Sequence, residues 1–190
     1  MAHGLIAWSA GAALLFAAAA ASAQAPPPPP VAIPNPAYTT MVLELSVDRP
    51  AAAVWARVGK FCDIREWLRN TCAITSGTES QLGAVRALGG GAVIEMMVGK
   101  TDLSYTYTQP VYEGRPYNLY HGCLEVKPLT AKTSRIVYTL MYDNSRIAGD
   151  DAAKAAEIQR RRTAFEKGVA NMKTLAEGGA LPPPAPPMPR

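Results

Sequence analysis

Hydrophobic and polar residues alternate through much of the chain, and a period of two is typical of half-buried β-strands. The first such segment is 41–47, in which every second residue from Met41 to Val47 is Met, Leu or Val. The same pattern returns in six further segments: 72–75, 84–88, 91–98, 103–109, 116–126 and 134–142. Turn-forming residues separate these segments, so the sequence predicts seven strands in an antiparallel sheet.

Helical spacing of apolar residues replaces this alternation in three places. Two predicted helices are short, at 51–58 and 61–68. The third is long: Asp150 and Asp151 favour a helix N-terminus, and the glycines at 178–179 end the helix. Its apolar stripe consists of Ile158, Phe165, Val169, Met172 and Leu175.

The predicted order is one strand, two short helices, six strands and one long helix. A sheet that buries one face needs a cover, and the last helix carries the long apolar stripe. We therefore predict an α+β fold in which a curved seven-stranded antiparallel sheet wraps around the C-terminal helix.

The two ends of the chain differ from this middle part. Residues 5–21 are apolar and alanine-rich and lead into Ala21-Ser22-Ala23, which predicts a signal peptide (1–23) cleaved near Ala23. A Pro-rich linker (24–37), the domain (38–179) and a Pro-rich tail (180–190) follow. We expect a periplasmic or secreted protein without stable membrane insertion. The alternative to a cleaved signal peptide is a retained membrane anchor. We expect the Pro-rich tails to be extended spacers, and the alternative is that they bind a partner.

Composition excludes some classes of protein. With 48% hydrophobic residues, the chain is not mostly disordered. The net charge is +4 and the basic residues are scattered from Arg49 to Arg190, whereas nucleic-acid binding calls for a concentrated basic face.

Three cysteines are present, an odd number for an oxidising compartment. Cys62 and Cys72 flank a short helical segment, and the sequence allows either a disulfide between them or two free thiols. A disulfide would leave Cys123 as the unpaired cysteine.

The glycines at 89–90 suit a two-residue hairpin turn. Such a turn places Leu88 opposite Gly91 and Ala84 opposite Glu95, so that Arg86 and Glu95 become diagonal neighbours on one face. Inside a cavity this pair would orient a ligand carboxylate, carbonyl or hydroxyl; at the rim it would be an ordinary solvated pair.

Several motifs in this order resemble the START-like helix-grip superfamily, specifically its polyketide cyclase/dehydrase and lipid-transport (SRPBCC) family. They are Val54-Trp55 through Gly59-Lys60-Phe61, Trp67, Gly83-Ala84-Val85-Arg86-Ala87-Leu88, Glu95, Ser104-Tyr105-Thr106-Tyr107, Leu119-Tyr120 and Ser134-Arg135-Ile136. The resemblance covers nearly all of residues 38–177. It departs at Trp67-Leu68-Arg69, where the family often has Trp-His-Pro. It implies a hydrophobic cavity between sheet and helix, but neither one ligand nor one reaction.

Aromatic and charged residues on the expected inner faces are candidates to line this cavity. Tyrosines offer apolar area together with a hydroxyl that needs a partner. The predicted ligand-binding residues are Trp67, Arg86, Glu95, Tyr105, Tyr107, Tyr120, Tyr138, Tyr142, Arg161 and Phe165.

Other chemistry finds little support. His121, Cys123 and Glu125 alternate on the opposite face of the Tyr120 strand, about 6.6–7 Å apart, which is too wide for one zinc ion. The second histidine, His3, lies in the predicted signal peptide, so no nucleophilic triad can form. We expect no metal and no cofactor.

We therefore expect an exported carrier or binding protein for a small hydrophobic molecule that is lipid-like, sterol-like or polyketide-like. One alternative is a cyclase- or dehydratase-like enzyme, in which Glu95 or a tyrosine acts as acid or base and Arg86 polarises a carbonyl. Another, which the resemblance implies, is an accessory partner of a periplasmic redox enzyme.

Overall fold

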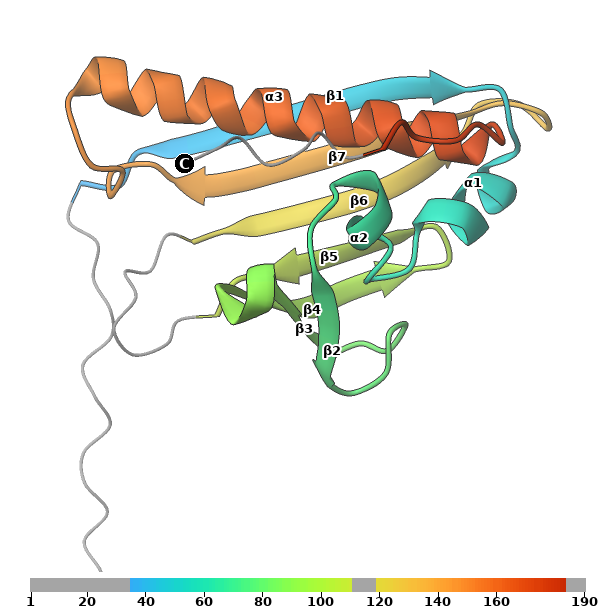
Figure 1. Cartoon of the computed structure of the whole chain (residues 1–190), viewed down its shortest axis with the longest axis horizontal. Coiled ribbons are helices and arrows are strands. Elements are labelled where there is room, and N and C mark those ends of the chain that lie inside the picture. Colours follow the sequence, from blue (N-terminus) through green and yellow to red (C-terminus); the bar gives the residue numbers. More distant parts are fainter. Residues whose placement is uncertain (1–34, 111–118, 184–190) are drawn as a thin grey trace, which may run out of the picture. The chain divides into compact units, whose positions relative to one another are not determined.

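A computed structural model describes residues 35–110 and 119–183. They form a curved seven-stranded antiparallel sheet with the long C-terminal helix packed across it, as predicted (Figure 1). The strand order is β1-β7-β6-β5-β4-β3-β2. The predicted signal peptide, most of the linker, the start of the strand predicted at 116–126 and the end of the tail lie outside the described residues.

The elements agree with the predicted segments in type and order, but the helix predicted at 61–68 is a single turn, at Ile64–Trp67. The strands are β1 (Tyr38–Val47), β2 (Cys72–Ser76), β3 (Val85–Leu88), β4 (Val93–Thr101), β5 (Ser104–Thr108), β6 (His121–Pro128) and β7 (Ser134–Asp143). The helices are α1 (Ala51–Val58), α2 (Ile64–Trp67) and α3 (Asp151–Ala176). No helix within the described part of the chain is both long and apolar enough to span a membrane.

The core lies between the concave face of the sheet and the helices. Alternate residues of β1 and β7 point inward, and they include Met41, Leu43, Val47, Ile136, Tyr138, Leu140 and Tyr142. Strand parity read from the sequence is thus confirmed for these two strands. The Asp150 side chain accepts a hydrogen bond from the Ala153 amide (2.9 Å) and caps α3.

The apolar stripe of α3 is buried unevenly. Val169, Met172 and Leu175, in the C-terminal half, are buried against the core. Ile158 and Phe165, nearer the N-terminus, pack against the same core but are only half-buried. The part of α3 from Val169 onward therefore closes the core, whereas the apolar side chains from Ile158 to Phe165 remain partly exposed.

The turn between β3 and β4 is longer than predicted. The Gly89–Gly91 segment forms a short 3-10 turn followed by Ala92, so four residues, not two, connect the strands. Leu88 consequently pairs with Val93, and Arg86 lies directly opposite Glu95. The predicted diagonal arrangement was wrong because all three glycines adopt positive φ angles, which allows a wider turn than a Gly-Gly pair suggests.

The first residues of the predicted tail contact the domain. Leu181 packs against the core, and the Arg69 guanidinium donates a hydrogen bond to the carbonyl of Pro182. Residues 181–182 thus contact the domain, where the sequence predicted a solvated spacer.

Candidate functional site

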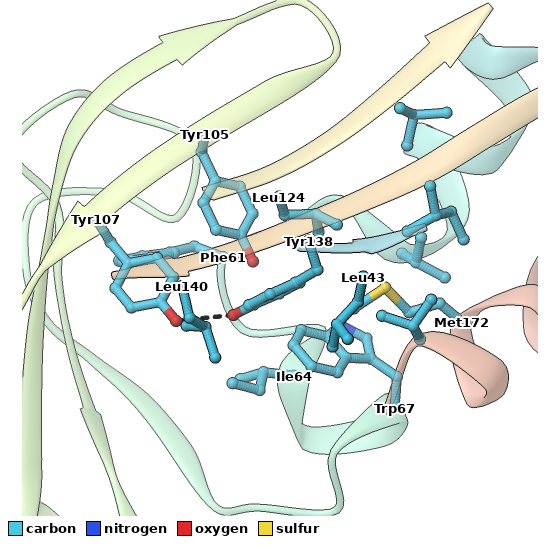
Figure 2. Close-up of a cluster of buried hydrophobic side chains, with 14 of the residues drawn as sticks. Leu43, Phe61, Ile64, Trp67, Tyr105, Tyr107, Leu124, Tyr138, Leu140 and Met172 are labelled. Atoms are coloured by element: carbon cyan, nitrogen blue, oxygen red, sulfur yellow. Dashed lines mark hydrogen bonds between the residues drawn. The ribbon is translucent and has the colours of Figure 1, made fainter. Parts of the chain in front are cut away.

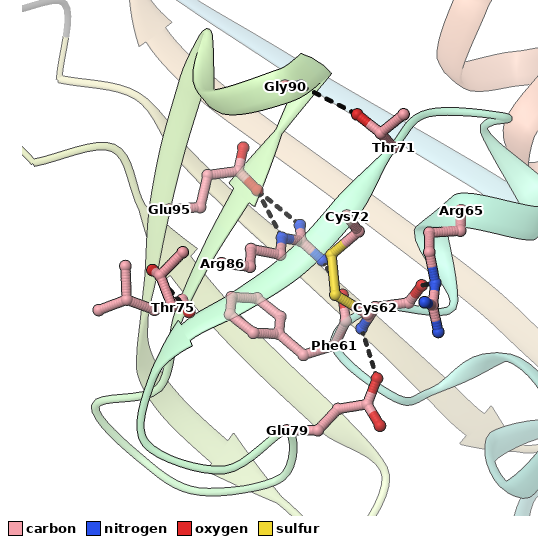
Figure 3. Close-up of a disulfide and its surroundings, with 11 residues drawn as sticks. Phe61, Cys62, Arg65, Thr71, Cys72, Thr75, Glu79, Arg86, Gly90 and Glu95 are labelled. Carbon is pink, nitrogen blue, oxygen red and sulfur yellow. Dashed lines mark hydrogen bonds and ion pairs between the residues drawn. A yellow bond between two sulfur atoms is a disulfide. The ribbon is translucent and has the colours of Figure 1, made fainter.

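Two adjacent strands bring a buried ion pair into the interior (Figure 3). Arg86 Nη2 lies 2.6 Å from Glu95 Oε2, and Arg86 Nε donates to the same oxygen at 2.8 Å. The two residues are 0% and 3% exposed, so the pair is internal and not at the rim. The second carboxylate oxygen of Glu95 accepts from the Gln109 amide at 3.4 Å.

The segment between α1 and α2 provides the remaining contacts of Arg86. Its Nη1 donates to the backbone carbonyl of Phe61, and its guanidinium carbon lies 4.0 Å from the centre of the Phe61 ring. The Tyr107 ring lies 4.8 Å away. Burial alone would lower the pKa of Arg86, but Tyr105 and the Glu95 carboxylate outweigh burial and leave it above the ordinary value. Arg86 therefore stays charged inside the domain.

A disulfide holds this segment in place. Cys62 and Cys72 are bonded, with 5.6 Å between their Cα atoms, and Cys123 is the free cysteine. Because Cys62 directly follows Phe61, the bond ties the Phe61 carbonyl and ring to the start of β2 (Figure 3).

Tyrosines from β5 and β7 meet in the middle of the core (Figure 2). The hydroxyls of Tyr107 and Tyr138 are hydrogen-bonded at 2.7 Å. The Tyr138 ring also contacts Phe165 of α3, at a centroid distance of 5.0 Å, and Trp67 of α2, at 5.8 Å. Burial raises the pKa of Tyr107 and Tyr138 well above the ordinary value, so both phenols are neutral hydrogen-bonding groups.

A second cation lies nearer the N-terminal half of α3. The Arg161 guanidinium carbon is 4.7 Å from the Tyr142 ring centre and 5.4 Å from that of Tyr120. The two rings stack on each other at 5.8 Å. Tyr120 and Tyr107 are 6.3 Å apart, so this group is continuous with the tyrosines of the core.

Some of these polar groups lack a partner. Within the described part of the chain, five buried side-chain atoms make no well-aligned hydrogen bond: Trp67 Nε1, Arg86 Nη2, Tyr105 Oη, Tyr142 Oη and Arg161 Nε. Arg86 Nη2 is nevertheless engaged by the Glu95 carboxylate at 2.6 Å. Protein interiors leave few polar groups unsatisfied, so the other four atoms call for a water or a ligand.

The structure places all ten predicted ligand-binding residues in one connected group. Eight are buried, and only Arg161 and Phe165 are half-buried. His121, Cys123 and Glu125 lie on the other face of β6 and are partly exposed. The described residues contain no group of three or more histidine, cysteine or acidic side chains arranged to hold a metal ion.

Sequence reasoning missed three contributors: Phe61, Gln109 and Gly122. A Cβ atom at Gly122 would lie 2.2 Å from Tyr107 Cζ, so only glycine lets the Tyr107 ring lie across β6. A glycine inside a strand pattern signals such a close approach, and this signal was available in the sequence. The Phe61 and Gln109 contacts span 25 and 14 residues and have no local signal.

Comparison with known proteins agrees with the fold. Residues 39–177 match the family model described as polyketide cyclase/dehydrase and lipid transport. This stretch runs from β1 to the end of α3. No curated protein matches the chain.

Solved structures share the fold at low identity. A solution NMR structure from Thermobifida fusca is 23% identical, with a TM-score of 0.59, and the match covers 75% of this chain and 97% of that one. The di-domain ARO/CYC BexL from the BE-7585A biosynthetic pathway is 18% identical, with a TM-score of 0.54, over 73% and 46% of the two chains. Ara h 8.0201 is 14% identical, with a TM-score of 0.50, over 72% and 98%. At these identities the likeness concerns the fold alone.

Proposed function

The chain belongs to the polyketide cyclase/dehydrase and lipid transport family, and from this premise we propose that it is an exported carrier of a small, mostly apolar molecule. The ligand lies between the sheet and the part of α3 from Ile158 to Phe165. Half-buried Ile158 and Phe165 provide apolar contact there, next to the tyrosines of the core.

The observation that carries this proposal is the set of unsatisfied polar atoms. Four of them, in Trp67, Tyr105, Tyr142 and Arg161, belong to residues for which the sequence predicts ligand contact. The fifth, Arg86 Nη2, is engaged by Glu95. A few polar groups within a mostly apolar and aromatic lining are typical of small-molecule sites. We infer that the ligand, together with bound water, completes these hydrogen bonds.

The state of Glu95 favours a carrier over a cyclase-like enzyme. One carboxylate oxygen accepts two contacts from Arg86, and the other faces Gln109. A general acid or base must come within hydrogen-bond reach of its substrate. Glu95 is engaged on both oxygens, so we assign it to holding Arg86 in place.

Native mass spectrometry of protein purified from the periplasm tests the proposal. We expect a stoichiometric adduct of one apolar molecule, which organic extraction would identify. Absence of an adduct, combined with turnover of a polyketide mimic, would favour the enzyme.

A pair of variants locates the site. Ile158→Trp adds a bulky side chain to the face of α3 that carries Phe165 and should weaken binding of the dye 8-anilinonaphthalene-1-sulfonate about tenfold, by excluding its rings. Ala156→Trp, at an exposed position on the other side of α3, is the matched control and should bind as the parent does. Equal affinities for both variants would place the ligand elsewhere.

Export remains part of the proposal, because residues 1–34 lie outside the described part. We expect the mature chain to begin at Gln24, after the small residues Ala21 and Ala23. N-terminal sequencing of protein from the periplasm decides this; a chain that still starts at Met1 would contradict export with cleavage.

A further inference from the structure

One face of α3 combines apolar residues with a cation. Ile158, Arg161 and Phe165 are spaced by three and four residues, so they share a face of the helix. Phe165 contacts the Tyr138 ring, and Arg161 lies over the Tyr142 ring. A molecule lying along this face would contact both the apolar side chains and the Arg161 guanidinium.

Two buried hydrogen-bond donors near this face are unsatisfied, one on α3 and one on β7. Arg161 Nε and Tyr142 Oη make no hydrogen bond within the described part of the chain. Tyr142 as a whole is 2% exposed. The guanidinium carbon of Arg161 is only 4.7 Å from the Tyr142 ring centre. Both donors can therefore bind the same ligand group.

Nearby acidic groups do not use up the charge of Arg161. Glu157 accepts a hydrogen bond from Arg161 Nη2 at 3.2 Å, but it also accepts two hydrogen bonds of 2.8 Å from Arg160. Glu166 lies near Arg162, at 3.8 Å. Glu95 is held by Arg86. The region around Tyr142 therefore retains net positive charge.

We propose that the ligand is an amphiphile with a carboxylate head, which binds Arg161 and the Tyr142 hydroxyl while its apolar tail follows Phe165 toward Tyr138. A carboxylate has two acceptor oxygens and one negative charge, which matches two donors and one cation. A neutral alcohol would leave the charge uncompensated. This inference rests on the proposed carrier function and specifies the class of its ligand.

Matched pairs of probes test the proposal. The affinities of the full chain for saturated fatty acids from octanoate to hexadecanoate are compared by calorimetry with those for the alcohols of equal chain length. We expect each acid that binds to do so at least about tenfold more tightly than its alcohol, because hydrogen bonds to a charged group are the stronger kind.

Two variants attribute this preference to the proposed donors. Arg161→Gln should bring the acid-to-alcohol ratio close to one. Tyr142→Phe removes only the hydroxyl and should reduce the ratio several-fold. Lys167→Gln also removes one positive charge from α3, at an exposed position, so it is the matched control and should keep the parent ratio.

The outcomes separate the two proposals. Equal binding of acids and alcohols by the parent, or an unchanged ratio in both Arg161→Gln and Tyr142→Phe, would overturn the carboxylate head but leave the carrier function standing. Binding of neither series would contradict both. Urea unfolding shows whether each variant is folded. If Arg161→Gln is unfolded, the acid-to-alcohol affinity ratio of Tyr142→Phe decides the test.

Discussion

Arg86 and Glu95 lie directly opposite each other on β3 and β4, and their 2.6 Å ion pair is closed off from solvent by Phe61 and the tyrosines. A buried pair of charges is stable only when the geometry and the additional hydrogen bonds are good. Here the Phe61 carbonyl supplies such a bond, and it joins the sheet to the segment between α1 and α2.

Removing the negative partner should therefore destabilise the fold. We expect Glu95→Gln to cost about 3–5 kcal/mol of unfolding free energy, because Arg86 would remain charged and unpaired in the core. Urea midpoints measure this. Glu44→Gln, which breaks the exposed Arg135–Glu44 pair (3.0 Å), is the control and should cost less than about 1 kcal/mol. Similar midpoints for the two variants would mean that the Arg86–Glu95 pair contributes no more than a surface pair.

Replacing both charges separates stability from ligand binding. Arg86→Met combined with Glu95→Leu removes the buried charges together, so it should recover most of the stability lost in Glu95→Gln. If the double variant also binds the native ligand like the parent, the pair is structural only. A folded double variant that has lost binding would show that the pair contacts the ligand.

Alanine substitution should affect stability differently at two glycines of the sheet. At Gly122 a Cβ would collide with the Tyr107 ring at 2.2 Å, so Gly122→Ala should cost about 1–3 kcal/mol and disturb the Tyr107–Tyr138 hydrogen bond. At Gly99 the nearest atom, in Thr106, is 3.6 Å away, an ordinary contact. Gly99→Ala should be close to neutral. Urea midpoints and near-ultraviolet circular dichroism compare them, and equal effects would contradict the close packing of Tyr107 on β6.

The disulfide predicts a definite number of free thiols. Protein unfolded without reductant should titrate one thiol, Cys123, and three after reduction. Opening the bond should lower stability by about 2–3 kcal/mol, the value expected for a loop of this length. Cys123→Ser should abolish the thiol signal before reduction and leave the melting temperature nearly unchanged. Three thiols before reduction would rule out the bond.

Alkaline pH should unfold the domain through its buried tyrosines. Burial raises the pKa of Tyr120 from 10.0 to about 12, with Arg161 opposing. Between these values the unfolded chain has lost a proton that the folded chain keeps, so stability falls as pH rises through this window. Phenolate absorbance and circular dichroism should change together above about pH 10. Tyr120→Phe should move the onset upward, whereas Tyr38→Phe, at an exposed position, should not. Phenolate formation well before any loss of structure would contradict this coupling.

The sequence by itself determined the elements, their order and the inward faces. Side chains alternate between the two faces of a strand and return to the same face of a helix about every 3.6 residues, so the spacing of apolar residues along one segment shows which face is buried. The inward positions of β1 and β7, the long stripe of α3 and the membership of Tyr138 and Tyr142 in the core could therefore be read without a structure.

Tertiary structure alone decided which residues meet. The four-residue turn after Leu88 shifted the pairing by two positions, and this shift placed Arg86 directly against Glu95. The Phe61 carbonyl reaches Arg86 across 25 residues, and Arg161 reaches Tyr142 from a different element. Such contacts depend on turn geometry and on the packing of distant segments, and neither leaves a repeat in the local sequence.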